Sequence, residues 1–212
     1  MKKIIGITGL KGSGKDTIGD IICKNFDFQK VAFADKLKDI VSVLFDWDRK
    51  MLSGFTPEDR AIREQPDEFW SKKFEKEFTP RMALQKIGTE VMRNNLDKSI
   101  WVYCLERKLI NENSNFVITD VRFRNEIEMI KRLGGTIIRV ERGERPEWWN
   151  LAGEFNTLNL NDYNGKFLLL MKVHNSERDW IDIDKPVKIF ENNGTIEDLE
   201  KEVVNFMNSE NE

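Results

Sequence analysis

A glycine-rich segment near the start of the chain constrains the fold most strongly. Residues 9–15 are Gly-Leu-Lys-Gly-Ser-Gly-Lys, the pattern G-x-x-x-x-G-K, followed by Asp16 where a Ser or Thr is usual. The apolar run before it, residues 3–8, predicts a buried strand, and isoleucines at helical spacing from Ile18 predict a helix after it. In that context backbone N–H groups converge on phosphate oxygens at a helix N-terminus. The segment therefore predicts a site for a phosphorylated nucleotide, with Lys15 bridging the outer phosphates.

Composition excludes several other classes of protein. The 212 residues carry a net charge of −3, which gives no overall basic field for direct binding of nucleic acid. No apolar run approaches the roughly 20 residues of a membrane span, and Lys and Gly interrupt the N-terminal run too early for a secretory signal. Cys23 and Cys104 lie in apolar helical patterns, which predicts reduced thiols in a cytosolic protein. With one histidine, they leave no plausible zinc site.

Alternating strands and helices indicate the fold class. Apolar runs at residues 30–33, 115–120, 136–141 and 186–190 predict four further strands, with helical patterns between them. Such alternation favours a parallel sheet with both faces covered. We therefore expect an α/β fold, a P-loop NTPase three-layer sandwich with a parallel five-stranded sheet. The third strand ends in Asp120, as a Walker-B strand does when it delivers a carboxylate beside the phosphates.

Two segments interrupt this pattern within what we expect to be a single domain over residues 1–212. The core would comprise about 1–45, 81–141 and 186–212. The first insertion, about 46–80, is expected to be irregular to residue 66 and then helical over 67–78. The second, about 142–185, is long and irregular, with an apolar run at 166–173 that would suit a hairpin strand, and predicts a lid. This layout suits phosphoryl transfer from a triphosphate on the glycine loop to an acceptor held by the first insertion.

One glycine inside a predicted helix needs an explanation. Gly88 and Thr89 lie in the middle of the helical pattern over residues 79–91. Glycine there costs about 1 kcal/mol relative to alanine. Either a ligand approaches the backbone closely at Gly88 or two helices pack tightly there.

With these features together, the chain resembles the deoxynucleoside monophosphate kinases of tailed bacteriophages, in the wider nucleoside monophosphate kinase group. The resemblance rests on residues 9–17, Gln85 to Glu90, Asn94 to Trp101, Asp120-Val121-Arg122 with Glu126, His174 to Glu177, and Asn192 to Thr195. It implies that ATP, with Mg²⁺, donates its γ-phosphoryl group to a deoxynucleoside monophosphate for DNA precursor synthesis. It also implies a homodimer in the host-cell cytosol. The lid is where the chain departs most from the family pattern.

The resemblance implies a role for individual residues. The ATP-binding residues would be Lys11, Gly12, Ser13, Gly14, Lys15, Asp16 and Thr17, with Asn192 and Gly194 near the adenine. The contact with Mg²⁺ would be Thr17, or Asp16 through water. The acceptor-binding residues would be Leu37, Lys38, Arg63, Gly88, Thr89, Trp101, Asp120, Arg122 and Glu126. The catalytic residues would be Lys15, Arg122 and the lid arginine Arg142, with Arg145 or Arg178 beside it.

Alternatives remain for several residues and for the reaction. Trp101 could equally be a core residue, and Glu126 or Arg63 could be solvated. Dephospho-coenzyme A kinases and phosphomevalonate kinases have similar glycine loops, and a nucleotide-binding switch without an acceptor is a further alternative. Residues 88–89 and 94–101 favour the phage nucleotide kinases. The bases accepted do not follow from the sequence.

Overall fold

The computed structural model describes residues 2–158, 172–183 and 185–210. The chain divides into two compact units, the first formed by Met1–Ala32 and Glu106–Glu212 and the second by Phe33–Leu105. The second unit therefore includes residues 33–45 and 81–105, which the sequence analysis assigns to the core. Within the part of the chain that is described, no helix has the length and apolar character needed to cross a membrane.

The first unit is built on a five-stranded sheet. Its strands are β1 (Ile4–Thr8), β2 (Phe28–Val31), β3 (Asn115–Ile118), β4 (Thr136–Glu141) and β5 (Lys188–Glu191), in the order β2-β3-β1-β4-β5. All four strand pairs are parallel, which confirms the predicted sheet. β2 begins two residues before the predicted start at residue 30, because its partner β3 spans only Asn115–Ile118 and Phe28 pairs with Asn115.

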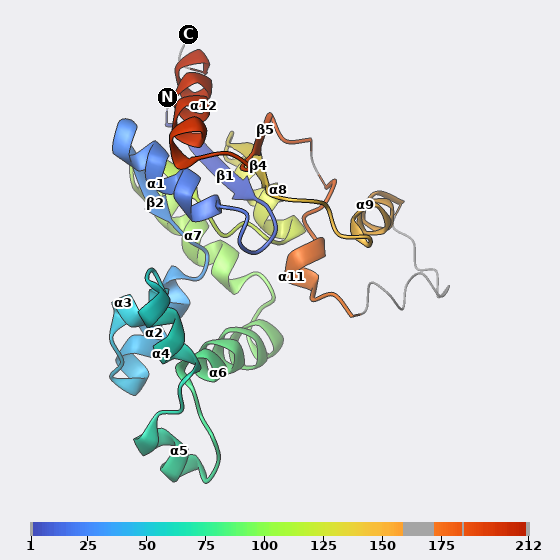
Figure 1. Cartoon of the computed structure of the whole chain (residues 1–212). Coiled ribbons are helices and arrows are strands. Elements are labelled where there is room, and N and C mark those ends of the chain that lie inside the picture. The colour runs from blue at the N-terminus through green and yellow to red at the C-terminus, as the bar shows by residue number, and fades with distance from the viewer. Residues whose placement is uncertain (1, 159–171, 184, 211–212) are drawn as a thin grey trace. The chain divides into compact units, whose positions relative to one another are not determined.

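Helices cover both faces of this sheet, giving three layers (Figure 1). On one face, Ile5 and Ile7 of β1 share a buried cluster with Ile18 of α1 (Lys15–Asn25) and Val203 of α12 (Ile196–Ser209). Gly6 points to the other face, where an added Cβ would come within 2.7 Å of Ile130 in α8 (Arg124–Arg132). Side chains alternate along a strand, so β1 contributes to both cores.

The second unit is helical. Its elements are α2 (Asp35–Phe45), α3 (Arg49–Ser53), α4 (Pro57–Glu64), α5 (Glu68–Phe74), α6 (Pro80–Gln85) and the π-helix η1 (Lys86–Arg93). α7 (Ile100–Asn111) then leads back into the first unit. The prediction that residues 46–66 are irregular is wrong, because the polar residues there cap helices. Asp48 accepts from the backbone of Lys50 at 2.5 Å, and Thr56 and Asp59 form a capping box.

Aromatic side chains form much of the core of the second unit. Phe45 stacks on Trp47 with ring centroids 4.6 Å apart and meets Trp70 edge-on at 5.0 Å. Phe78 is 5% exposed and packs on the same cluster, whereas Phe69 is 59% exposed. Trp70 and Phe78 therefore belong to the core of this unit, whereas Phe69 does not.

The segment 142–185 is more regular than predicted. It contains α9 (Trp149–Leu158) and α11 (Asn175–Arg178). Trp149 and Trp180 are each 3% exposed, and their rings meet edge-on at 5.3 Å. The contact between these two buried tryptophans joins the beginning and the end of the segment. An irregular sequence pattern therefore did not mean an irregular structure here. The predicted hairpin strand at 166–173 lies mostly outside the described residues.

Candidate active site

The glycine loop joins the end of β1 to the start of α1. Gly9, Gly12 and Gly14 have φ values of 151°, 81° and 106°, which side chains with a Cβ rarely adopt. A Cβ at Gly9 would also lie 2.5 Å from the Val140 carbonyl oxygen, and one at Gly14 would collide with the Asn192 amide. At Gly12 an added Cβ would have no heavy atom within 4 Å. Neighbouring atoms therefore pack tightly against the loop at Gly9 and Gly14 and leave it open at Gly12.

Lys15 is folded over this loop. Its Nζ donates to the carbonyl oxygens of Gly9 and Leu10, both at 2.8 Å, and the residue is 9% exposed. Burial and then the positive charge of Arg122 lower the pKa of Lys15 to about 8, although the carboxylates of Glu177 and Asp16 act in the opposite direction. The ammonium group is therefore mostly charged at pH 7, but its pKa lies only slightly above that pH.

Asn192, at the end of β5, ties that strand to the loop. Its side-chain amide donates to the Ser13 carbonyl at 2.8 Å, and its backbone N–H donates to Glu141 at 2.8 Å. The buried Ser13 hydroxyl makes no hydrogen bond with any described residue. Gly194 lies in the turn before α12, where a Cβ would come within 3.2 Å of Asp198. The predicted role of Asn192 and Gly194 at the adenine stays a prediction.

The residues suited to a divalent cation lie at the start of α1. The exposed Asp16 accepts a hydrogen bond from the Thr119 hydroxyl at 2.8 Å, and Thr17 is half-buried in the first turn. Among the described residues, no group of three or more His, Cys, Asp or Glu side chains is placed to hold a metal ion. This set fits Mg²⁺ held by one hydroxyl, nucleotide phosphates and water, which is its usual coordination in phosphoryl-transfer sites.

The segment after β3 brings a buried carboxylate and an arginine beside the loop. Glu126 is 2% exposed, and its Oε2 accepts from the backbone N–H groups of Arg122 at 2.7 Å and Phe123 at 3.1 Å. The alternative that Glu126 is solvated is therefore wrong: it fixes the start of α8. Arg122 is half-exposed, and its Nη1 lies 3.6 Å from the Glu177 carboxylate. Asp120, two residues beyond β3, is partly exposed.

The three candidate lid arginines differ in their surroundings. Arg142 is exposed and, with Leu10 and Trp149, lines a small pocket. Arg145 forms two 2.9 Å hydrogen bonds to the Glu141 carboxylate, and its guanidinium lies 5.1 Å from the Trp149 ring centre. Arg178 is 8% exposed and bonds to Asn175 within α11, so its surroundings are those of a structural residue.

In the second unit, Gly88 and Trp101 are linked directly. The indole Nε1 of Trp101 donates to the Gly88 carbonyl oxygen at 3.0 Å, and Trp101 is 3% exposed. A Cβ at Gly88 would lie 2.6 Å from a methyl group of Leu37. Tight packing of two helices therefore accounts for Gly88, and Trp101 has the surroundings of a core residue. Thr89, next in η1, is exposed.

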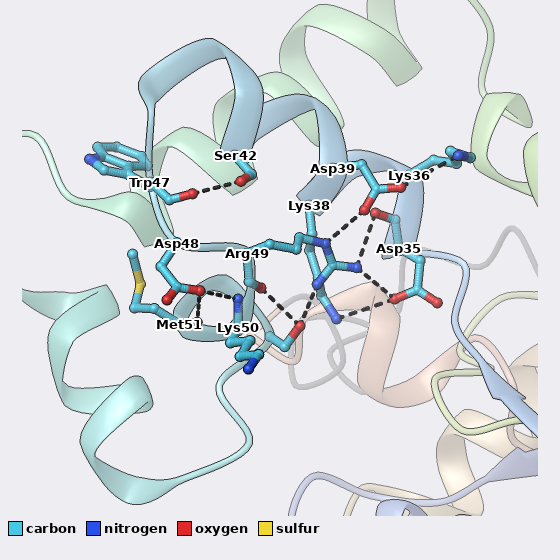
Figure 2. A network of polar contacts seen from close by, with 11 residues as sticks. Asp35, Lys36, Lys38, Asp39, Ser42, Trp47, Asp48, Arg49, Lys50 and Met51 are labelled. Atoms are coloured by element: carbon cyan, nitrogen blue, oxygen red, sulfur yellow. Dashed lines mark hydrogen bonds and ion pairs between the residues drawn. The ribbon is translucent and has the colours of Figure 1, made fainter.

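The two predicted basic residues of the second unit are both held by their neighbours. Figure 2 shows Lys38 in the polar network between α2 and α3, with its Nζ 3.9 Å from Asp35, which also pairs with Arg49 at 3.1 Å. Arg63 donates to the Leu52 carbonyl at 3.1 Å and packs on Gly54. Burial and then the charge of Arg81 lower the pKa of Arg63. Because Arg63 is half-buried and hydrogen-bonded to the backbone, the alternative of a solvated arginine is wrong.

Sequence reasoning gave no individual role to two residues that contact the loop region. Glu177 accepts from the Lys11 backbone N–H at 3.1 Å, and Thr119 donates to Asp16. Thr119 stands next to Asp120 at the end of an apolar strand, a position that could have indicated a role. A single glutamate in the polar segment 142–185 carries no such signal.

A glycine loop between the first strand and first helix of a parallel sheet, with a lysine folded over it, defines a P-loop nucleotide-binding protein. The family model for deoxynucleotide monophosphate kinase matches residues 3–59 and 60–150. The chain belongs to this family. The match assigns no role to single residues, so the roles of Gly88 and Trp101 stay predictions.

Individual relatives agree with the family model. A putative deoxynucleotide monophosphate kinase of Acanthamoeba polyphaga mimivirus is 36% identical, covering 66% of this chain and 74% of the relative. The deoxynucleotide monophosphate kinase of Enterobacteria phage T4 is 23% identical, covering 66% of this chain and 81% of the relative. Among solved structures, dephospho-CoA kinase from Campylobacter jejuni aligns over 98% of this chain and 97% of its own, with 17% identity and a TM-score of 0.49.

Proposed function

We propose that this protein transfers the γ-phosphoryl group of ATP to a deoxynucleoside monophosphate, giving the deoxynucleoside diphosphate and ADP. The observation that carries the proposal is the open glycine loop with Lys15 folded over it, in a chain of the deoxynucleotide monophosphate kinase family. Backbone N–H groups and the N-terminus of α1 bind phosphate oxygens, and the Lys15 ammonium neutralises charge that develops on the transferring group.

Other residues hold the two substrates in this proposal. Asn192 and Gly194 lie by the adenine, and Arg122 binds the acceptor phosphate. The other residues assigned to the acceptor site are Leu37, Lys38, Arg63, Gly88, Thr89, Trp101, Asp120 and Glu126. Because Glu126 and Trp101 are buried, they act by fixing the backbones of Arg122 and Gly88 rather than by touching the acceptor.

Mg²⁺ and the lid complete the proposed site. Thr17, or Asp16 through water, would hold Mg²⁺, which would neutralise charge on the donor phosphates. Arg142 stabilises the transferring group from the second insertion. We also propose that the protein acts as a homodimer in the host-cell cytosol on small-molecule substrates. The net charge of −3 supports the absence of direct nucleic-acid binding.

The proposal is tested with purified protein, Mg-ATP and a panel of acceptors. The panel holds dGMP, dTMP, dCMP, dAMP, their ribose counterparts and dephospho-coenzyme A, with ADP release and product identity as readouts. We expect diphosphate formation from some deoxynucleotides. Turnover of dephospho-coenzyme A alone would favour the other kinase reaction, and slow ATP hydrolysis unaffected by every acceptor would favour the switch.

Lys15→Ala is the control for the loop. It removes the ammonium group that the transition state needs, so turnover should fall by about a thousandfold or more, while far-UV circular dichroism stays unchanged. Near wild-type turnover in this variant would contradict the assignment of the loop.

A further inference from the structure

Glu177 places a carboxylate directly on the glycine loop. Its Oε2 accepts from the backbone N–H of Lys11 at 3.1 Å, and its Oε1 lies 3.6 Å from Nη1 of Arg122. The side chain is 24% exposed, and its negative charge raises the pKa of Lys15. One carboxylate therefore interacts with three groups that the proposed function assigns to phosphates: a loop amide, the loop lysine and Arg122.

The charges around Glu177 explain why a carboxylate lies there. Burial and then the positive charge of Arg122 lower the pKa of Lys15, so the loop carries a cation that lacks full compensating negative charge. The Lys11 amide and the Arg122 guanidinium both lie within reach of one carboxylate, and a carboxylate satisfies N–H donors much as phosphate oxygens do. Glu177 belongs to α11, the short helix labelled in Figure 1. His174 caps the start of this helix, where its Nδ1 accepts a hydrogen bond from the Ser176 backbone N–H at 3.2 Å.

We propose that Glu177 is an internal competitor for the phosphates of ATP: its carboxylate holds Lys11 and Arg122 in the free protein and leaves when nucleotide phosphates bind. The inference rests on the proposed function in that ATP is the ligand. A triphosphate and a carboxylate repel one another, so both do not share the same donors. Displacement frees Arg122 at the moment when donor phosphates occupy the loop.

The competition should appear as a higher apparent dissociation constant for ATP. When a fraction of the protein is competent to bind, the apparent dissociation constant is the intrinsic one divided by that fraction. A carboxylate that occupies the loop in four-fifths to nine-tenths of the molecules weakens ATP binding about fivefold to tenfold. Glu177→Gln keeps the size of the side chain and removes its charge, so it should tighten ATP binding by this factor.

The test measures dissociation constants by calorimetry for wild type, Glu177→Gln and Glu177→Ala. The ligands are ATP, ADP, inorganic tripolyphosphate and adenosine, without Mg²⁺ so that metal binding plays no part. Both variants should bind the three phosphate ligands more tightly and adenosine no differently. Glu147→Gln is the matched control, because it removes one charge from an exposed residue of the same segment; its affinities should equal those of wild type.

Two outcomes overturn the inference. Unchanged affinity for ATP and tripolyphosphate in both Glu177 variants would show that the carboxylate does not compete. Weaker binding would show that Glu177 supports the bound state. If wild type binds neither ATP nor tripolyphosphate, the proposed function itself fails, so the two failures are distinguishable.

Discussion

Burial disfavours the charged form of Lys15, yet that charged form is the one that its proposed role in binding phosphates requires. The residue is 9% exposed, and its ammonium group donates to two loop carbonyls at 2.8 Å. Burial and the charge of Arg122 lower its pKa to about 8. Incoming phosphates would replace the lost hydration with negative charge and raise that pKa again. Nucleotide binding should therefore be linked to the protonation of this one residue.

This linkage predicts how ATP affinity depends on pH. The charged form of Lys15 binds phosphate, and its fraction in the free protein falls as pH rises through about 8. ATP should therefore bind about tenfold more weakly at pH 9 than at pH 7, with uptake of protons near pH 8. Calorimetry in two buffers of different ionisation enthalpy measures both effects. Lys15→Arg stays charged, so its affinity should change little over that range; an equally flat profile for wild type would contradict the prediction.

At the scale of elements, the π-helix η1 depends on a hydrogen bond from outside it. Trp101, in α7, donates to the Gly88 carbonyl, and Leu37 of α2 fills the space that a Cβ at Gly88 would need. π-helical turns are rare and frequent at functional sites. Here residues of two other helices, α2 and α7, contact η1 at Gly88, and the neighbouring Thr89 is exposed.

Trp101→Phe tests this arrangement. The change removes the indole N–H, leaves the Gly88 carbonyl without that donor and shrinks a buried side chain. The free energy of unfolding should fall by about 1–3 kcal/mol, measured by urea denaturation. Tyr103→Phe, on the exposed side of the same helix, should change it by less than about 0.5 kcal/mol. Equal effects of the two substitutions would show that the bond contributes nothing.

At the scale of the whole molecule, the predicted site residues are divided between two compact units. The residues assigned to ATP all belong to the first unit, whereas most of those assigned to the acceptor lie within residues 33–105. The two substrates should therefore protect different parts of the chain.

Amide hydrogen exchange followed by mass spectrometry checks this expectation. ATP should slow exchange in residues 9–17, and a deoxynucleoside monophosphate accepted in the assay should slow it in η1. Lys15→Ala should lose the first effect and keep the second, because the ammonium group contacts donor phosphates. Protection by the monophosphate confined to the first unit would contradict the acceptor assignments in the second.

The sequence alone was sufficient for the sheet and the glycine loop. Strand, loop and helix are signalled by residues adjacent in the chain, and the glycines are required by backbone conformation at Gly9, Gly12 and Gly14. The same local information failed in residues 46–66, where Asp48 and Thr56 can signal either a loop or a helix cap. Only the completed helices distinguish the two.

Long-range packing decided what sequence left open. Gly88 opposes Leu37 across 51 positions of the chain, and Glu177 reaches the Lys11 amide across 166, so no local pattern could pair them. Burial separated the alternatives for Glu126 and Arg63, since a carboxylate or guanidinium next to charged neighbours looks the same in sequence whether it is solvated or enclosed. The sequence thus determined that a phosphate-binding loop would form, and the tertiary structure decided which charges face it.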